Sequence, residues 1–259
     1  MDLGIAGRKA IVCASSRGLG RACARALAQA GCEVIINGRD GKALDATATE
    51  LRQATGAKVS AVQADVATPE GQAALLGACP EPDILVNNNA GPPFRDFRQL
   101  TRAQMIDGVI ANMVVAIELT QKVIDPMVRR KFGRIVNITS GSVKMPLAGL
   151  DLSSGARAGL TAFFAGVARA VAASNVTINF LLPGTFDTER LASNIAANAN
   201  SKGIPIEQAK AERIATVPAR RFGQPDEFGA ACAFLCSAQA GYITGQNLLI
   251  DGGAFPGAM

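Results

Sequence analysis

The stretch from Lys9 to Gly31, KAIVCASSRGLGRACARALAQAG, constrains the fold of this chain most strongly. The apolar run 10–14 predicts a buried strand. The turn 15–20 contains two glycines, and apolar residues follow it at helical spacing. Such glycines let a backbone approach a pyrophosphate, and the start of the next helix offers free N–H groups and a positive dipole end. An ordinary strand–turn–helix with tolerated glycines would look the same, but the run 33–38 predicts the second strand of a dinucleotide-binding βαβ unit.

Strand and helix patterns alternate along the rest of the chain, and we predict one α/β domain over residues 1–259. Asp40 and Thr101 are placed to cap helices, and Pro126 is expected to kink the long helix that Thr101 begins. The expected architecture is a doubly wound parallel sheet of about seven strands with helices on both faces. The second strand has its apolar part at 34–37, and further strands are predicted at 58–64, 83–88, 134–139, 176–182 and 243–250. Helices are predicted at 41–54, 69–79, 101–130, 153–173, 225–237 and, in two pieces separated by 198–205, at 189–215.

Composition narrows the class of protein. The chain has 259 residues, of which 49% are hydrophobic and 18% charged, so it can bury a sizeable core. It contains no apolar run long enough to span a bilayer, and Met1–Gly7 does not have the pattern of a signal peptide. The net charge is +5, but the positive residues are scattered, which argues against a nucleic-acid surface and is compatible with a phosphorylated cofactor.

The six cysteines and the absence of histidine exclude further chemistries. The cysteines occur mostly at apolar positions, without a CxxC pair, so we expect free buried thiols and no metal site. A reduced, cytoplasmic protein is the simplest interpretation. Without histidine, the chain cannot carry a Ser-His-Asp hydrolase site.

The glycine turn resembles the T-G-x-x-x-G-x-G signature of the short-chain dehydrogenase/reductase family. It reads CASSRGLG here, with Cys13 for Thr and Ala14 for Gly. We expect Ala14 to be accommodated only with a negative φ, in a slightly altered turn. The turn residues that the resemblance assigns to the cofactor are Ser15, Ser16, Arg17, Gly18, Leu19 and Gly20.

The resemblance extends over nearly the whole chain and implies a Rossmann fold and an NAD(P)-dependent oxidoreductase, with the 3-oxoacyl reductase subgroup most similar in the C-terminal half. It implies that Asp65 and Val66 line the adenine pocket, and that Asn112 and Ser140 take the family's structural-catalytic asparagine and catalytic serine positions. Further cofactor contacts are implied for Asn89, Ala90 and Gly91 of the Asn-Asn-Ala-Gly motif, and for Pro183, Gly184 and Thr188. The C-terminal similarity lies in Arg221-Phe222-Gly223, Pro225, Gly245-Gln246 and Asp251-Gly252-Gly253.

The end of the second strand predicts which cofactor is bound. An acidic residue there would hold a ribose 2′-hydroxyl, but the position is Gly38, and Arg39 follows it. Arg17 lies in the glycine turn, so two planar guanidinium groups could hold a 2′-phosphate. Solvated surface arginines are the alternative. The pattern predicts NADP(H) rather than NAD(H).

The family's catalytic tyrosine and lysine are missing. At the two positions, counted from Ser140, stand Ser153 and Arg157, and the only tyrosine, Tyr242, lies in the C-terminal part. A serine hydroxyl is a far weaker acid than a phenol. Arginine stays charged, so it can hold a ribose hydroxyl but cannot donate a proton.

Three hypotheses follow. The first is a reductase with a non-tyrosine proton source, in which Ser140 and Ser153 orient the carbonyl and Asn112 holds a water chain. Lys144 would supply the proton if it is desolvated, and it is otherwise a solvated loop lysine. The second is a lyase similar to the halohydrin dehalogenases, which carry Arg at the lysine position but keep the tyrosine. The third is a non-catalytic NADP(H)-binding or scaffolding subunit.

The substrate side and the assembly follow from the resemblance. A small-molecule carbonyl compound is the implied substrate, under a lid at 188–216. Arg95, Arg98 and Arg102 could meet an anionic substrate or form a solvated helix start. Helices 101–130 and 153–173 are expected to pair in a homodimer or homotetramer, because the second is rich in small residues.

Overall fold

The structure is a computed structural model that describes residues 2–92 and 94–257. In these residues, seven parallel strands form one sheet in the order β3-β2-β1-β4-β5-β6-β7. The strands are β1 (Lys9–Val12), β2 (Glu33–Gly38), β3 (Val59–Gln63), β4 (Ile84–Asn87), β5 (Gly133–Ile138), β6 (Val176–Pro183) and β7 (Asn247–Ile250). The order reverses between β1 and β4, and doubly wound sheets bind ligands beyond the carboxyl ends of the strands at this point. The predicted sheet is confirmed.

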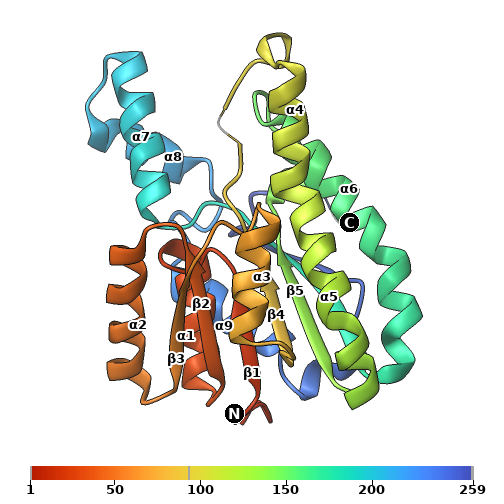
Figure 1. Cartoon of the computed structure of the whole chain (residues 1–259). Helices are drawn as coiled ribbons and strands as arrows, with labels where there is room; N and C mark the ends of the chain where they lie inside the picture. The colour runs from red at the N-terminus through yellow and green to blue at the C-terminus, as the bar shows by residue number, and fades with distance from the viewer. Residues whose placement is uncertain (1, 93, 258–259) are drawn as a thin grey trace.

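Helices cover both faces of the sheet (Figure 1). On β1, Ala10 and Val12 face one core while Ile11 and Cys13 face the other, because side chains alternate along a strand. Helices α1, α2 and α9 pack on the first face, and α3, α5 and α6 pack on the second. The helices are α1 (Gly18–Gln29), α2 (Gly41–Thr55), α3 (Pro69–Ala78), α4 (Arg102–Val109), α5 (Val115–Arg130), α6 (Asp151–Val171), α7 (Glu189–Lys202), α8 (Ile206–Ala215) and α9 (Pro225–Leu235).

Local sequence signals set the starts of several helices. The carboxylate of Asp40 accepts from the N–H of Ala43 at 3.1 Å and caps α2. Thr101 and Gln104 form a reciprocal capping box at the start of α4. Each such cap stabilises a helix by about 1 kcal/mol. The predicted caps at Asp40 and Thr101 are therefore confirmed.

Three elements differ from the prediction. The long helix is interrupted by a π turn at Ile110–Val114, while α5 runs through Pro126 to Arg130. The helix predicted to end near residue 198 continues to Lys202, and Gly203 ends it in the left-handed conformation at φ 65°. The last strand begins only at Asn247, because Gly245 two residues before it has a left-handed backbone, at φ 71°, which a strand does not adopt.

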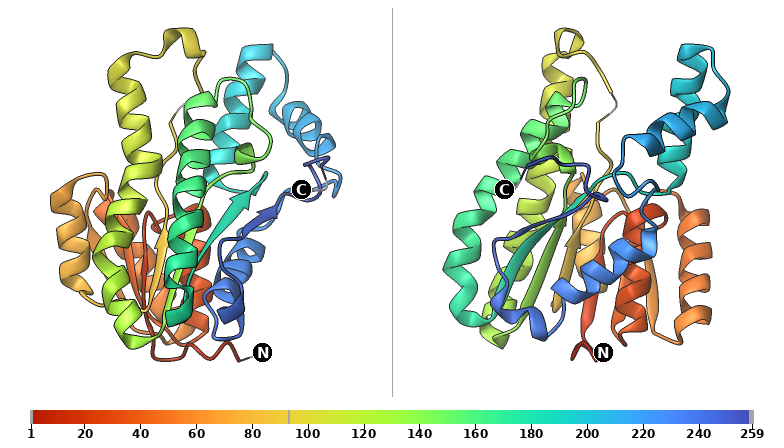
Figure 2. Two further views of the ribbon diagram at one scale, coloured as in Figure 1. Left: turned by 90° about the vertical axis from the view of Figure 1, so that its right-hand side faces the viewer. Right: turned by 180° about the vertical axis from the view of Figure 1, so that it is seen from behind.

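Helices α7 and α8 rise above the carboxyl edge of the sheet, on the other side of that edge from α4 and the start of α6 (Figures 1 and 2). They share a small apolar cluster of Ile195, Ala199, Ala209 and Phe222. The apolar residues of these helices thus pack largely on one another rather than on the sheet.

Two helical stretches, Arg102–Arg130 and Asp151–Ser174, are long and apolar enough to cross a membrane by length and composition alone. The sequence prediction considered only unbroken apolar runs and did not single them out. In the structure, Leu119 and Val123 of the first stretch and Phe164 of the second are buried against the sheet. Core helices of water-soluble α/β proteins are packed in this way.

Candidate functional site

The glycine turn between β1 and α1 is built for close backbone approach. A Cβ on Gly20 would lie 2.4 Å from the carbonyl oxygen of Ala14, so only glycine fits there. Ser15 fixes the turn, because its hydroxyl donates to the carbonyl of Val12 at 2.6 Å and accepts from the N–H of Asn37 at 3.0 Å. No side chain caps the start of α1 at Arg17, so the first N–H groups of the helix point out of the turn. This geometry suits a pyrophosphate.

Ala14 corrects one expectation. Its φ is +45°, whereas we expected a negative value. The left-handed conformation costs a non-glycine residue about 1–2 kcal/mol. It is held on both sides here, since Asn37 Oδ1 accepts from the N–H of Ala14 at 3.3 Å and Asn88 Nδ2 donates to its carbonyl at 3.2 Å. The turn therefore adopts the left-handed conformation at this position without a glycine.

The two arginines that were expected to select the cofactor have exposed side chains, Arg17 at the start of α1 and Arg39 directly after β2. In the protein alone, Arg17 pairs with Asp40 at 2.9 Å, and Arg39 lies 3.8 Å from Asp65. Gly38 is required for packing, because a Cβ there would lie 2.9 Å from the hydroxyl of Ser16. No carboxylate replaces it at the end of β2. A bound 2′-phosphate would compete with Asp40 and Asp65 for these two arginines. Exposed ion pairs of this kind contribute little to stability, so the arginines are available to the phosphate.

The residues after β3 and β4 connect these strands to the rest of the site. Asp65 accepts from the N–H of Ala67 at 2.9 Å, and Val66 next to it is buried. Asn88 holds the glycine turn through the bond to Ala14, and Asn89 donates to the carbonyl of Ala111 in the π turn at 3.3 Å. The Asn-Asn-Ala-Gly motif thus joins the glycine turn to the helix that carries Asn112.

The segment after β6 returns to the glycine turn. Gly184 is required there, because a Cβ would lie 2.6 Å from Asp251. The hydroxyl of Thr188 accepts from the N–H of Leu191 at 3.3 Å and caps α7, and its methyl group would lie 3.9 Å from a Cβ on Gly18. Pro183, Gly184 and Thr188 are therefore brought to the strand edge where the cofactor was expected.

Arg157 is the structural centre of the expected catalytic group. It is buried, and its Nη1 donates to the carbonyls of Ile138 and Thr139 at 2.8 Å each, so α6 is tied to the end of β5 just before Ser140. Its Nε donates to the hydroxyl of Ser153 at 3.2 Å. Burial, and secondarily the charge of Arg190, lowers the pKa of Arg157 to about 10, so the guanidinium remains charged at neutral pH.

The two serines are left as hydrogen-bond donors. The Ser153 oxygen accepts from Arg157, and the Ser140 oxygen accepts from the N–H of Ser142 at 3.1 Å. Each hydroxyl can therefore direct its own hydrogen to a further acceptor. For Ser153, the adjacent guanidinium charge also strengthens that donation.

Asn112 lies in the π turn, and its Nδ2 donates to the carbonyl of Gly108 at 3.0 Å. Its Oδ1 and that of Asn87 are buried and have no partner among the described residues. Both asparagines and Arg157 border a cavity of about 20 Å³. A cavity of that size with polar walls holds one water molecule.

Lys144 is directed elsewhere. Its ammonium lies 5.6 Å from the centroid of the Phe255 ring in the C-terminal segment. It is not among the described residues that line either cavity beside Ser153 and Arg157. The structure thus brings together Ser153, Arg157 and Asn112 around the two cavities, with Ser140 directly after the Thr139 carbonyl that Arg157 holds. It favours the alternative interpretation of Lys144 as a loop lysine.

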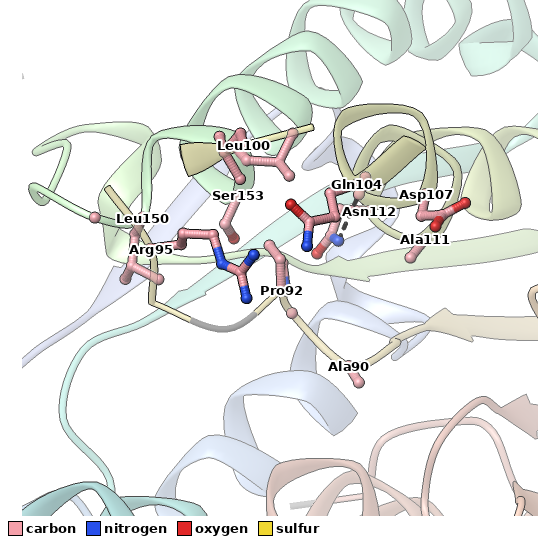
Figure 3. A pocket seen from close by; sticks show the side chains of 14 residues that line it. Ala90, Pro92, Arg95, Leu100, Gln104, Asp107, Ala111, Asn112, Leu150 and Ser153 are labelled. Atoms are coloured by element: carbon pink, nitrogen blue, oxygen red, sulfur yellow. Dashed lines mark hydrogen bonds between the residues drawn. The ribbon is translucent and has the colours of Figure 1, made fainter. Parts of the chain in front are cut away.

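A larger cavity of about 310 Å³ opens beside Ser153 (Figure 3). Its wall is mostly apolar, and its polar side chains come from Arg95, Gln104, Asp107, Asn112 and Ser153. Arg95 reaches in from the loop, and Asp107 lies on the opposite side. The apolar lining consists of Ala90, Gly91, Pro92, Leu100, Gly108, Ala111, Gly149, Leu150 and Leu152.

The structure separates the three arginines of the loop. Arg95 lines the cavity, while Arg98 is held by both carboxylate oxygens of Asp96 at 2.7 and 2.9 Å. Arg102 is exposed at the start of α4. Only Arg95, of these three, is placed to meet a ligand in the cavity.

Sequence reasoning missed several residues of the site. Asn37 and Asn87 looked like ordinary strand residues, although their side chains hold neighbouring backbone or face the small cavity. Arg190 was not singled out, because nothing in its spacing points to a ligand. A basic residue two positions after Thr188, at the start of the helix that follows β6, was the available signal.

Comparison with known proteins agrees with this geometry. The family model described as enoyl-(acyl carrier protein) reductase matches residues 13–254. The 3-oxoacyl-[acyl-carrier-protein] reductase of Aquifex aeolicus is 30% identical over 98% of this chain and 100% of its own length. The acetoacetyl-CoA reductase of Allochromatium vinosum is 32% identical over 96% of this chain and 98% of its own.

A solved structure shares the whole architecture. L-sorbose reductase from Gluconobacter frateurii, complexed with NADPH and L-sorbose, has a TM-score of 0.94 at 27% identity and covers 99% of this chain and 100% of its own. Together with the glycine turn, the Asn88–Gly91 segment and the seven-stranded sheet, the family match shows that the chain belongs to the short-chain dehydrogenase/reductase family of oxidoreductases.

Proposed function

We propose that the protein is an NADP(H)-dependent reductase that converts a carbonyl group to an alcohol without a tyrosine as the proton source. The observation that carries the proposal is the pair of Ser153 and Arg157, in which a buried guanidinium donates to a hydroxyl on the wall of the larger cavity. The relatives support the reaction class, because 3-oxoacyl and acetoacetyl-CoA reductases match over nearly their full lengths.

The assignment of NADP(H) as the cofactor rests on two places: the glycine turn, which fits a pyrophosphate, and the end of β2, which fits a 2′-phosphate. Gly20 leaves the space that a pyrophosphate needs, and Thr188 lies beside Gly18. Arg17 and Arg39 would hold the 2′-phosphate, and Gly38 offers no carboxylate to a ribose hydroxyl. NADPH or NADP is present in structural neighbours, including the L-sorbose reductase and a 3-oxoacyl reductase from Agrobacterium tumefaciens. When bound, NADPH supplies the hydride.

The chain's own residues would stabilise the charge that develops on the carbonyl oxygen. The Ser153 hydroxyl donates a hydrogen bond to that oxygen, and the charge of Arg157 one bond away strengthens the donation. Loss of a placed general acid costs roughly 10² to 10⁴ in rate, so we expect slow turnover. The proton itself is drawn from water through the cavity between Asn87, Asn112 and Arg157.

The test is a titration with NADPH and NADH, followed by a panel of carbonyl compounds monitored by the loss of reduced nicotinamide absorbance. We expect NADPH to bind at least tenfold more tightly than NADH and to be oxidised with some member of the panel. Failure of NADPH to bind would overturn the cofactor assignment. Tight NADPH binding without oxidation on any panel member would instead support a non-catalytic NADP(H)-binding subunit, the candidate that the missing tyrosine and lysine favour.

A double substitution tests whether the rest of the site is competent. We predict that Ser153→Tyr with Arg157→Lys raises kcat about 10²-fold, because it restores a placed acid. The lysine ammonium has three donors in place of the planar five-donor fork and cannot keep all the bonds that Arg157 makes, so the free energy of unfolding should fall by about 1–3 kcal/mol. Rate assays and denaturant unfolding measure the two effects. Arg157→Lys alone is the control, and an unchanged rate in the double variant would contradict the prediction.

The domain organisation, assembly and location are also proposals. We infer one domain over residues 1–259, with 188–216 as the substrate lid, because α7 and α8 form their own cluster above the sheet edge. On α6, Gly155 and Gly166 face open space, which allows a second helix to approach closely in a homodimer or homotetramer. All six cysteines are free and buried, as expected of a cytoplasmic protein.

A further inference from the structure

Arg190 lies at the start of α7, and its guanidinium comes close to that of Arg157. It is the second residue of the helix, whose N-cap is Thr188. A Cβ on Gly91 would lie 3.4 Å from Nη2 and 3.6 Å from Nη1 of Arg190, and 3.6 Å from Nη2 of Arg157. Two guanidinium groups, one buried and one exposed, therefore converge on a single glycine.

Neither charge is neutralised within the part of the chain that the structure describes. No carboxylate of residues 2–92 or 94–257 lies within 4.0 Å of Arg157 or Arg190. The nearest acidic neighbour in sequence, Glu189, is directed to Arg17 at 3.8 Å. Nη2 of Arg157 also has no acceptor among the described residues, whereas Nε and Nη1 are bonded.

Two like charges so close together disfavour each other, the more so because Arg157 is buried, and a bound anion removes that penalty. A planar guanidinium matches the two oxygens of a carboxylate, and such charge-assisted bonds are about twice as strong as neutral ones. The free Nη2 of Arg157 belongs to the same guanidinium whose Nε holds Ser153. An anion at Gly91 would therefore lie close to the group that meets the carbonyl oxygen.

The cavity allows a substrate of this kind. Gly91 and Ser153 both line it, so a molecule can reach Ser153 with one group and Gly91 with another. Arg95 lines the cavity as well, and Asp107 lies on the side of the cavity opposite to Arg95 (Figure 3). An anionic group is thus favoured beside Gly91 and Arg95 and disfavoured beside Asp107.

We propose that the carbonyl substrate carries a carboxylate, which Arg190 binds beside Gly91 with the charge of Arg157 behind it, while Ser153 donates to the carbonyl oxygen. The inference rests on the proposed reductase function and names the class of its substrate, a short oxo acid. It also makes Arg190 the residue that determines specificity. The other possible source of the anion is a phosphate of the cofactor, and the experiment separates the two.

The experiment compares 2-oxobutanoate with its neutral methyl ester, using the full-length protein, NADPH and the Arg190→Met variant. Methionine has a similar length and helix propensity but no charge. We expect the wild type to prefer the acid. In the variant, kcat/KM for the acid should fall about 10- to 100-fold, with the ester changed less than threefold. Arg190→Lys should recover part of the loss. Arg129→Met, which removes an exposed charge from the end of α5, outside the proposed lid and both cavities, is the matched control and should change neither rate.

If turnover is too slow to measure, the binding of substrate-like ligands tests the proposal instead. Calorimetry of oxamate and of neutral oxamide with the NADPH complex should show oxamate binding that Arg190→Met weakens at least tenfold. If Arg190→Met raises the Kd of NADPH and leaves the acid-to-ester ratio unchanged, the anion is the cofactor's and the inference is overturned. Turnover of esters as fast as acids also overturns it but leaves the reductase function standing. Oxamate binding without oxidation of any carbonyl compound supports the anion site and contradicts the proposed function.

Discussion

At the scale of single residues, the side chains at the site serve different purposes from those their spacing suggests. Arg157 stands at the position of the family's catalytic lysine. It donates three hydrogen bonds, one to Ser153 and two to the carbonyls at the end of β5. It is therefore a positioning residue for Ser153 and for the strand end before Ser140. The buried charge is retained without a carboxylate partner in the described chain, which is the feature that most distinguishes this site.

Selection of the cofactor belongs to this scale, and Arg39→Ala tests it. We predict that the Kd for NADPH rises about 10- to 100-fold, because a charge-assisted contact with the 2′-phosphate is lost, while the Kd for NADH changes less than twofold. Fluorescence titration of both nucleotides measures the effect. Arg17→Ala should behave similarly but more weakly, since Asp40 already neutralises part of its charge.

Arg129→Ala serves as the control, because it removes an exposed charge from the end of α5, which packs on the opposite face of the sheet from α2. Equal weakening of NADPH and NADH binding by Arg39→Ala would mean that Arg39 attracts both nucleotides by its charge and does not recognise the 2′-phosphate.

The contrast between Arg39 and Ala14 shows what a sequence can predict at the scale of single residues. The positions of Gly18, Gly20 and Arg39 follow from the motif. The positive φ of Ala14 does not, because it depends on Asn37 and Asn88, which lie far away in sequence.

At the scale of elements, the strand–turn–helix order and most boundaries follow from hydrophobic periodicity. The run Glu33–Gly38 is a strand with the predicted limits, since its apolar residues are buried on both faces of a parallel sheet. The π turn at Ile110–Val114 could not be predicted, because one extra residue per turn leaves almost no trace in the apolar pattern. It nevertheless places Asn112 against the small cavity, so this irregular element positions a site residue.

Substitutions of two glycines, Gly20 and Gly108, distinguish the cofactor site from the substrate cavity at this scale. In Gly20→Ala, the new Cβ meets the Ala14 carbonyl, a backbone atom that cannot move cheaply. We predict loss of NADPH binding and a fall in the free energy of unfolding of about 1–3 kcal/mol. In Gly108→Ala, the Cβ meets Leu152 of α6 at 2.4 Å, and that side chain can only turn into the larger cavity.

For Gly108→Ala we therefore expect a KM for the carbonyl compound raised at least threefold, with the Kd of NADPH changed less than twofold. Titration and initial-rate assays of the two variants give both quantities. Gly77→Ala is the matched control. A Cβ there meets nothing within 4 Å, so it should stabilise α3 by about 0.5–1 kcal/mol without affecting binding. If Gly108→Ala weakened NADPH as strongly as Gly20→Ala does, the two subsites would not be separate.

At the scale of the whole molecule, one sheet carries two apolar cores, and the site lies where the strand order reverses. The sequence predicts this architecture because buried parallel strands alternate with amphipathic helices. The convergence of Arg157, Arg190 and Gly91 is different, since these residues come from three segments whose relative positions only the folded chain defines. The same burial that forms the cores also removes the cysteines from solvent.

The buried thiols predict how stability depends on pH. Burial raises the pKa of Cys13 and of Cys32 to about 12, and it also raises the pKa of Cys79, whereas an unfolded thiol titrates near 9.0. Because the folded pKa is the higher one, the stabilisation is complete below pH 9 and is lost as the pH rises toward 12. Each such thiol should lower the free energy of unfolding by about 1.4 kcal/mol per pH unit in that window.

Denaturant unfolding at pH 8, 9 and 10 measures this slope. The range stays at or below the pKa of Arg157, about 10, whose lowered value acts in the opposite direction at higher pH. Cys13→Ala should make the curve less steep by the contribution of one thiol, at the cost of a small cavity worth about 1 kcal/mol at every pH. A parallel downward shift without any change of slope would show that Cys13 does not contribute to the alkaline instability. Since Cys13 follows β1 directly and is fully buried, such a result would contradict the closed strand end that the structure shows.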